Sequence, residues 1–231
     1  MSKLGLASRT VAATWVRDGR VSVNGKRVRD PEFPVVQGRD RIRVDGAEAG
    51  AATRVVVALH KPRGLVTTRD DEQGRDTVYS CLDDPGLPWL APVGRLDKAS
   101  EGLLLLSNDP EWAARITGPG GPEKTYHVQV DAVPTDAALQ ALVAGIEDEG
   151  GTGRLAAVSA RLLRSGGKTA WLEVVLDEGR NRQIRRLLAA QGLGVLRLLR
   201  VQIGTLVLGN LAKGAWRRLD VGEIAALIPA R

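Results

Sequence analysis

The sequence predicts an α+β protein in which a small helix-and-hairpin unit precedes a larger domain with a mixed or antiparallel sheet. Segments rich in β-branched and apolar residues outnumber helical segments, and they do not alternate regularly with helices as in βαβ folds. The pair Asn24-Gly25 between two short alternating segments is a strong hairpin signal. We therefore expect an N-terminal unit, the head, over residues 1–50 and a second domain, the body, over residues 54–231.

The head is predicted to begin with a helix. Ser8 is a suitable N-cap, and apolar residues follow at helical spacing until Asp18-Gly19 ends the pattern. Residues 47–53 are small and featureless, which is typical of a linker. The expected strands of the head are 20–23, 26–29 and 41–44.

The body is predicted to begin with a buried strand, because residues 54–59 form a β-branched apolar run. Four consecutive leucines at 103–106 predict another. The remaining expected strands are 124–130, 155–163, 170–176 and 195–208. The expected helices are 109–117, 135–145 and 181–191.

Composition excludes several classes. One cysteine, Cys81, cannot form an internal disulfide or a cysteine-rich zinc site, and two unclustered histidines give no metal-site pattern. Since no nucleotide-binding glycine loop appears either, we expect no cofactor and no metal. No apolar run approaches the roughly 18 residues that span a bilayer, and the N-terminus does not resemble a signal peptide. We therefore expect a cytoplasmic monomer without membrane contact.

The charge balance favours a polyanionic partner. The chain carries 33 Lys and Arg against 27 Asp and Glu, a net charge of +6. The head holds ten basic and six acidic residues, so its net charge is 10 − 6 = +4.

The segment 94–106 holds the most distinctive carboxylate. Asp97 lies between Arg95 and Lys98 and precedes an apolar strand that would support its loop. An ionised, positioned carboxylate can act as a nucleophile or a general base. The structural alternative is that Asp97 caps a turn or pairs with an arginine.

The segment 178–188 predicts an arginine-rich helix capped by Asn181. Arg182, Arg185 and Arg186 would share one face, opposite the apolar residues of the helix. Three like charges on one face repel each other unless an anion compensates them. Either RNA phosphates and Asp97 fill that role, or the face is simply solvated.

Two further segments hold candidate site residues. Tyr126 lies on an alternating strand, where its ring could stack on a base or pack in the core, and His127 would point to the opposite face. Lys61 enters a Pro-Arg-Gly turn, which on its own is an ordinary basic turn.

Together and in this order, the segments resemble the Rsu-type pseudouridine synthases, which modify ribosomal RNA and often carry an N-terminal RNA-binding domain of the ribosomal-protein S-four type. The resemblance covers almost the whole chain. The head of this family usually begins with a helix before its Ala-Ser-Arg, whereas only six residues precede Ala7 here, so we expect either a shortened first helix or a start that lies further upstream. The motifs that carry the resemblance are Ser8-Arg9, Asp18-Gly19-Arg20-Val21, Val23-Asn24-Gly25, Lys61-Pro62-Arg63-Gly64, Gly94-Arg95-Leu96-Asp97, Ser100-Glu101-Gly102-Leu103-Leu104, Lys124-Thr125-Tyr126 and residues 178–186.

The resemblance implies roles for individual residues. Asp97 matches the essential aspartate, Tyr126 the tyrosine that stacks on the target uracil, and Arg185 the basic residue that pairs with the aspartate. Arg95 matches a residue implicated in filling the space left by the flipped nucleotide. The other expected RNA contacts are Arg182, Arg186, Arg9 and Arg20, and Lys61 is either a structural residue or an RNA contact.

The implied activity is the isomerisation of uridine to pseudouridine in ribosomal RNA, with 23S rRNA favoured over 16S rRNA. Asp97 could attack the ribose C1′ or assist formation of a glycal, and the sequence leaves both routes open. One alternative is a non-catalytic rRNA-binding factor for ribosome assembly. Another is a glycosidase-like hydrolase, for which Glu101 is the only nearby second carboxylate.

Overall fold

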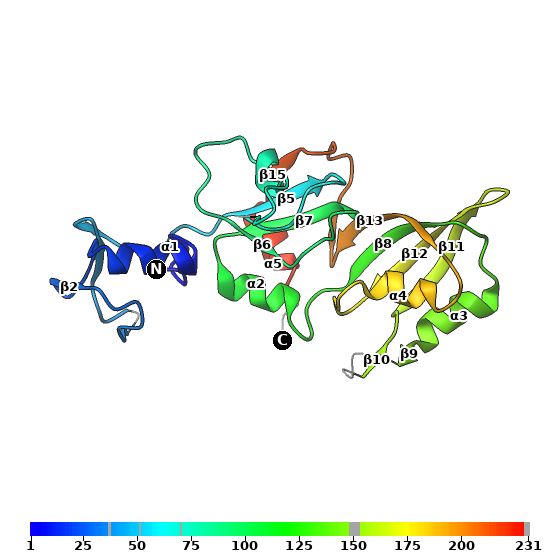
Figure 1. The fold of residues 1–231 in the computed structure, drawn as a ribbon, viewed down its shortest axis with the longest axis horizontal. Helices are drawn as coiled ribbons and strands as arrows, with labels where there is room; N and C mark the ends of the chain where they lie inside the picture. Colours follow the sequence, from blue (N-terminus) through cyan, green and yellow to red (C-terminus); the bar gives the residue numbers. More distant parts are fainter. Residues whose placement is uncertain (37, 51, 70, 148–152, 229–231) are drawn as a thin grey trace.

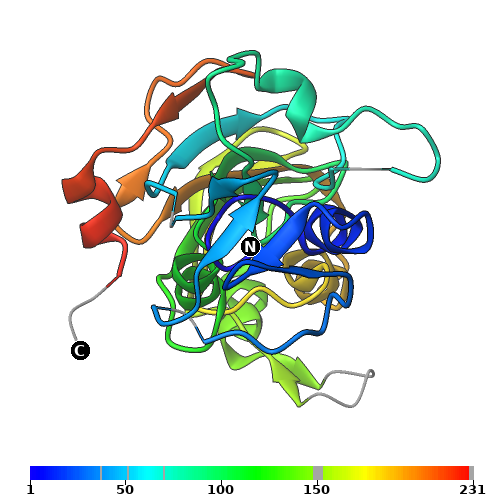
Figure 2. The same cartoon turned by 90° about the vertical axis from the view of Figure 1, so that its left-hand side faces the viewer.

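The fold is described from a computed structural model that places residues 1–36, 38–50, 52–69, 71–147 and 153–228. The head lies at one end of the long axis and the body's sheet extends away from it (Figure 1). Figure 2 looks along that axis, with the helix and strands of the head in front of the body. No helix within the described ranges is long and apolar enough to cross a membrane.

The head forms around one helix and a small antiparallel sheet. Helix α1 (Arg9–Arg17) starts at Ser8, whose hydroxyl accepts a hydrogen bond from the Val11 amide over 3.1 Å. Asn24 and Gly25 have φ angles of 51° and 82°, the left-handed pair that a tight hairpin requires, so the predicted hairpin is confirmed. The strands, in the sheet order β2-β1-β3-β4, are β2 (Lys26–Val28), β1 (Val21–Val23), β3 (Ile42–Val44) and β4 (Ala47–Glu48).

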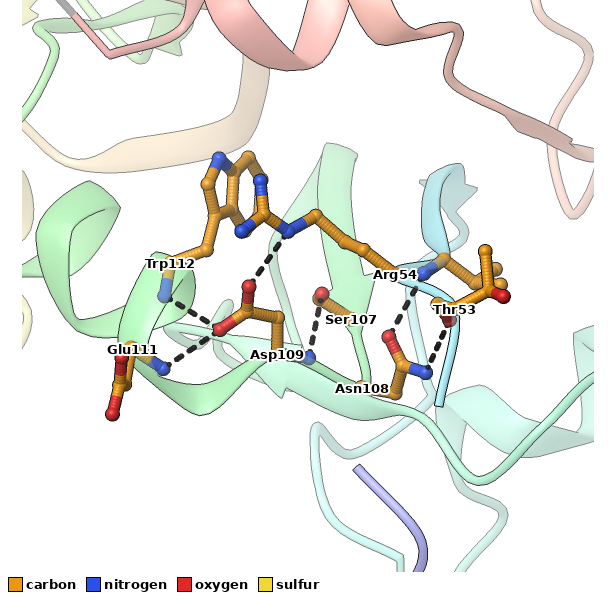
Figure 3. A network of polar contacts seen from close by, with 8 residues as sticks. Thr53, Arg54, Ser107, Asn108, Asp109, Glu111 and Trp112 are labelled. Atoms are coloured by element: carbon orange, nitrogen blue, oxygen red, sulfur yellow. Dashed lines mark hydrogen bonds and ion pairs between the residues drawn. The ribbon is translucent and has the colours of Figure 1, made fainter. Parts of the chain in front are cut away.

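The segment predicted as a linker is instead partly bound to both units. Strand β4 pairs with β3, and the Ala52 amide donates to the Leu4 carbonyl over 3.0 Å. Asn108 accepts a hydrogen bond from the Val55 amide at 2.8 Å and donates to the Thr53 carbonyl at 2.9 Å (Figure 3). Small residues give no side-chain signal, so these main-chain bonds could not be read from the sequence.

The body is built on a mixed nine-stranded sheet, which confirms the predicted fold class. Strand β13 runs parallel to β7, and the other pairings are antiparallel. Along its main path the order is β11 (Ser159–Ser165), β12 (Ala170–Leu176), β8 (Lys124–Val130), β13 (Val195–Ile203), β7 (Glu101–Ser107), β5 (Val56–Lys61) and β15 (Trp216–Arg218). Strand β14 (Leu206–Val207) pairs with β13 and β6 (Ala91–Val93) with β7, while β9 (Ile146–Glu147) and β10 (Arg154–Leu155) form a separate pair.

Helices cover both faces of this sheet. Alternation along β5 assigns Val57 and Leu59 to one apolar cluster and Val56 and Ala58 to another. The first cluster includes residues of α3 (Asp136–Ala144) and α4 (Gln183–Ala189). The second cluster packs against α2 (Pro110–Thr117) and α5 (Val221–Ala226). A short 3₁₀ helix spans Val78–Cys81.

Candidate active site

The loop that carries Asp97 joins β6 to β7 and is anchored on a rigid base. All seven residues of β7 are buried between neighbouring strands. The Lys61 ammonium, at the end of β5, donates hydrogen bonds to the carbonyls of Pro62 at 3.0 Å, Asp97 at 3.2 Å and Ser100 at 2.8 Å. The backbone of Asp97 is therefore held by Lys61, while the Asp97 side chain is 39% exposed and accessible to a substrate.

Lys61 itself has no exposed surface, which favours a structural role for this residue over a contact with RNA. Its side chain turns inward because three main-chain carbonyls converge on it. Burial lowers the pKa of Lys61 to about 8. Lys61 is thus a positioning residue for the Asp97 loop.

The Asp97 carboxylate faces the start of α4. Its Oδ2 atom lies 3.6 Å from Nη1 of Arg182 and 3.9 Å from Nε of Arg185. The Arg185 side chain is only 15% exposed, and burial together with Arg182 lowers its pKa. Two guanidinium groups therefore lie beside a single carboxylate.

The cap of α4 differs from our prediction. The N-cap residue is Arg182 and not Asn181, and its backbone adopts the left-handed conformation with φ 50°. This conformation separates Arg182 from the regular helix, so the three arginines do not form one uniform face. Ile184, Leu187 and Leu188 are buried, as the helical pattern predicted.

Tyr126 projects from β8 toward the same site. Its residue exposure is 7%, and alternation places it on the face opposite His127, whose imidazole lies 3.5 Å from Glu173. The ring belongs to the core cluster and also lines the pocket, so its packing in the core is confirmed, whereas its stacking on a base stays a prediction.

These side chains line one open pocket of about 150 Å³. The Asp97 loop, β8 and α4 each contribute, although they lie far apart in the sequence. The predicted site residues that line the pocket are Arg95, Asp97, Tyr126, Arg182 and Arg185.

The other predicted RNA-binding residues lie outside this pocket. Arg9 is exposed at the start of α1, and the guanidinium of Arg20 binds Asp45 in the head, with Nε at 3.1 Å, and lies over the Trp15 ring. Arg186 Nη1 donates to the Asn181 carbonyl at 3.4 Å. Arg20 and Arg186 thus have structural partners that the charge pattern did not reveal.

Three charged residues near the site are buried, which the sequence analysis did not predict. Lys124 and Arg200 line the pocket, while Glu101 lies on β7, fully buried beside Arg197 at 2.9 Å and Lys213 at 3.0 Å. Burial opposes the ionisation of Glu101, but the two cations outweigh it and lower its pKa. The strand pattern carried no signal for buried charge, although Lys124 stood within the tyrosine motif.

Comparison with known proteins gives consistent matches. A family model described as RNA pseudouridylate synthase matches residues 55–190, and one described as S4 domain matches residues 1–42. The chain is 37% identical over 233 residues to an uncharacterized RNA pseudouridine synthase of Aquifex aeolicus, covering 100% of this chain and 92% of that protein. It is 36% identical over 227 residues to ribosomal large subunit pseudouridine synthase B of Bacillus subtilis, covering 96% and 91%. A crystal structure of a pseudouridylate synthase aligns with a TM-score of 0.68 and 31% identity, covering 98% of this chain and 96% of that one.

Proposed function

The chain belongs to the RNA pseudouridylate synthase family, and we propose that it converts uridine to pseudouridine in large-subunit (23S) ribosomal RNA. The observation that carries the proposal is the meeting of Asp97, Tyr126 and Arg185 around one pocket. The relatives named as large-subunit synthases support 23S rRNA over 16S rRNA.

Each of the three residues has a role that fits its position. The target uridine leaves its helix, which costs a few kcal/mol, and stacking on Tyr126 returns about 1–3 kcal/mol. Asp97 acts at the ribose C1′ atom, either by direct attack or by assisting loss of a ribose proton to give a glycal. Arg185 orients the Asp97 carboxylate from a largely buried position.

The reaction is an isomerisation. The bond between C1′ and N1 breaks, a bond between C1′ and C5 forms, C5 loses a proton and N1 gains one. The surroundings of Glu101 favour this over hydrolysis, because a glycosidase needs a second carboxyl group that can act as an acid, and Glu101 is bound to two cations.

RNA binding involves both parts of the chain. We propose that Arg95 and Arg182 contact the RNA at the pocket, and that the positively charged head contacts it farther away, with Arg9 as an exposed candidate. We propose a monomer as the functional unit. Because the proposed substrate is ribosomal RNA, the cytoplasm is the proposed location.

The test is an Asp97→Asn substitution combined with pseudouridine mapping of 23S and 16S rRNA in a strain that lacks the gene. We expect wild-type protein to restore a 23S signal, Asp97→Asn to restore none, and RNA affinity to stay nearly unchanged. Asp136→Asn, an exposed carboxylate at the start of α3, is the matched control and should restore the signal. Wild-type protein that binds rRNA without forming pseudouridine would indicate an assembly factor, and abasic product would indicate a hydrolase.

A further inference from the structure

Two buried cations adjoin Tyr126 at the pocket. Lys124 is 7% exposed and Arg200 is 5% exposed. Lys124 precedes Tyr126 by two residues on β8, and Arg200 pairs directly with Tyr126 across β8 and β13. All three side chains therefore project from the same face of the sheet, and all three line the pocket.

Neither cation has a carboxylate partner within 4.0 Å among the residues that the structure places. Lys124 Nζ makes only a long contact of 3.5 Å with the Asp177 carbonyl, and Arg200 Nε donates to the Leu103 carbonyl at 2.7 Å. Arg200 Nη2 is buried without a hydrogen-bond partner. Burial and the proximity of Arg200 lower the pKa of Lys124. Two adjacent buried cations without a counter-ion are costly, so their placement calls for an anion.

The proposed reaction produces such an anion inside the pocket. When the C1′–N1 bond breaks, its electron pair stays with the base, and the negative charge spreads over N1, O2 and O4. This happens whether Asp97 attacks C1′ or a glycal forms. The charge lasts until C5 bonds to C1′, after which C5 releases its proton and N1 takes one up.

We infer that Lys124 and Arg200 are catalytic residues that stabilise the negative charge of the detached uracil ring while it stacks on Tyr126. This inference rests on the proposed function. A base on the Tyr126 ring would have both cations as immediate neighbours. Fixed charges that are almost fully buried on paired strands stabilise developing charge more strongly than solvated ones. A backbone phosphate suits these cations less well, because both lie almost fully beneath the surface.

The experiment compares Lys124→Met and Arg200→Met with Lys168→Met, an exposed lysine in the turn between β11 and β12. Single-turnover rates are measured on an rRNA fragment whose target position holds either uridine or 5-fluorouridine. The rate is that at which the original nucleoside disappears. Fluorine withdraws electrons and stabilises the leaving anion by itself. We expect each pocket variant to lose about 100- to 1000-fold in rate on uridine, the usual effect of removing one charge-stabilising donor. The loss on 5-fluorouridine should be at least tenfold smaller, with the affinity for RNA unchanged and Lys168→Met unaffected.

An equal loss on both nucleosides would show that the cations only support the fold, and retention of the full rate on uridine would also overturn the inference. If the methionine variants do not unfold cooperatively on heating, the same measurements are made on Lys124→Gln and Arg200→Gln. A wild-type enzyme that leaves uridine unchanged would instead overturn the proposed function. The two failures are therefore distinguishable.

Discussion

The buried ammonium group of Lys61 donates a hydrogen bond to the main-chain carbonyl of Asp97 over 3.2 Å. Lys61 ends β5 and pairs with Gly102 near the start of β7, while Asp97 lies in the loop that leads into β7. The carboxylate proposed for catalysis is therefore positioned through its backbone, by a cation with no exposed surface of its own.

This arrangement predicts a pH dependence of stability. The pKa of Lys61 is about 8 in the folded protein, below its ordinary value of 10.5. Between these values the unfolded chain binds the proton more strongly, so the contribution of Lys61 to the free energy of unfolding rises with pH. Urea denaturation measures the free energy of unfolding of the wild type and of Lys61→Met from pH 7 to 10.5. The difference between the two should rise with pH by up to about 1.4 kcal/mol per pH unit. Parallel curves for the two proteins would contradict it.

Arg182 predicts a separation of stability from activity. Its left-handed backbone, with φ 50°, suits glycine better than any residue with a Cβ atom. We expect the free energy of unfolding of Arg182→Gly to be about 1 kcal/mol higher than that of Arg182→Ala. Both variants lose the cation 3.6 Å from Asp97, so both should slow pseudouridine formation by about tenfold, or ~1.4 kcal/mol. Equal stability of the two variants would show that the backbone at Arg182 is unstrained.

Much of the fold follows from local patterns. Strands 124–130 and 170–176 match the structure at both ends, and along both of them buried residues alternate with half-buried ones. The loop around Asp97 and the helix beside it were also predicted as the site. The C-terminal helix α5 was missed although its capping box, Asp220 with Glu223, is a local signal in the sequence.

The remaining features depend on contacts between distant segments. Arg200 looks like any charged residue on a strand, and only the pairing of β13 with β8 and β7 buries it beside Tyr126. Lys61 likewise looked like an exposed turn residue until its carbonyl partners were placed around it. Burial of a charged group is a property of the assembled sheet, so spacing along one segment could not reveal it.

Gly102 predicts a strong packing effect next to the site. Its φ is +107°, and a Cβ atom there would lie 2.3 Å from the Arg200 carbonyl oxygen and 2.7 Å from its nitrogen. We expect Gly102→Ala to cost about 2–5 kcal/mol, adding left-handed strain of ~1–2 kcal/mol to overpacking of ~1–3 kcal/mol. Thermal unfolding measures this, with Gly167→Ala as the control because an added Cβ atom at Gly167 would have no neighbour within 4 Å. A small effect at Gly102 would mean that β7 and β13 separate easily.

The contact between Asn108 and the connecting segment predicts a coupling between the head and the body. Asn108 is 3% exposed and bonds the main chain of Thr53 and Val55, while an added Cβ at Gly5 would lie 2.6 Å from the Asn108 carbonyl oxygen. Asn108→Ala leaves two main-chain groups unpaired, at about 1–3 kcal/mol for each that stays buried. The head should then be held less firmly, because Gly5 packs on the same residue.

We expect Asn108→Ala to speed proteolytic cleavage near residues 47–55 and to weaken RNA binding several-fold, with the rate at saturating RNA unchanged. The pocket residues do not include Asn108, so chemistry should proceed once RNA is bound. Gly5→Ala should act in the same direction from the head's side, whereas Gly50→Ala, with open space around it, should not. If Asn108→Ala lowered the saturated rate and left RNA affinity intact, the junction would act on the catalytic loop and not on the placement of the head.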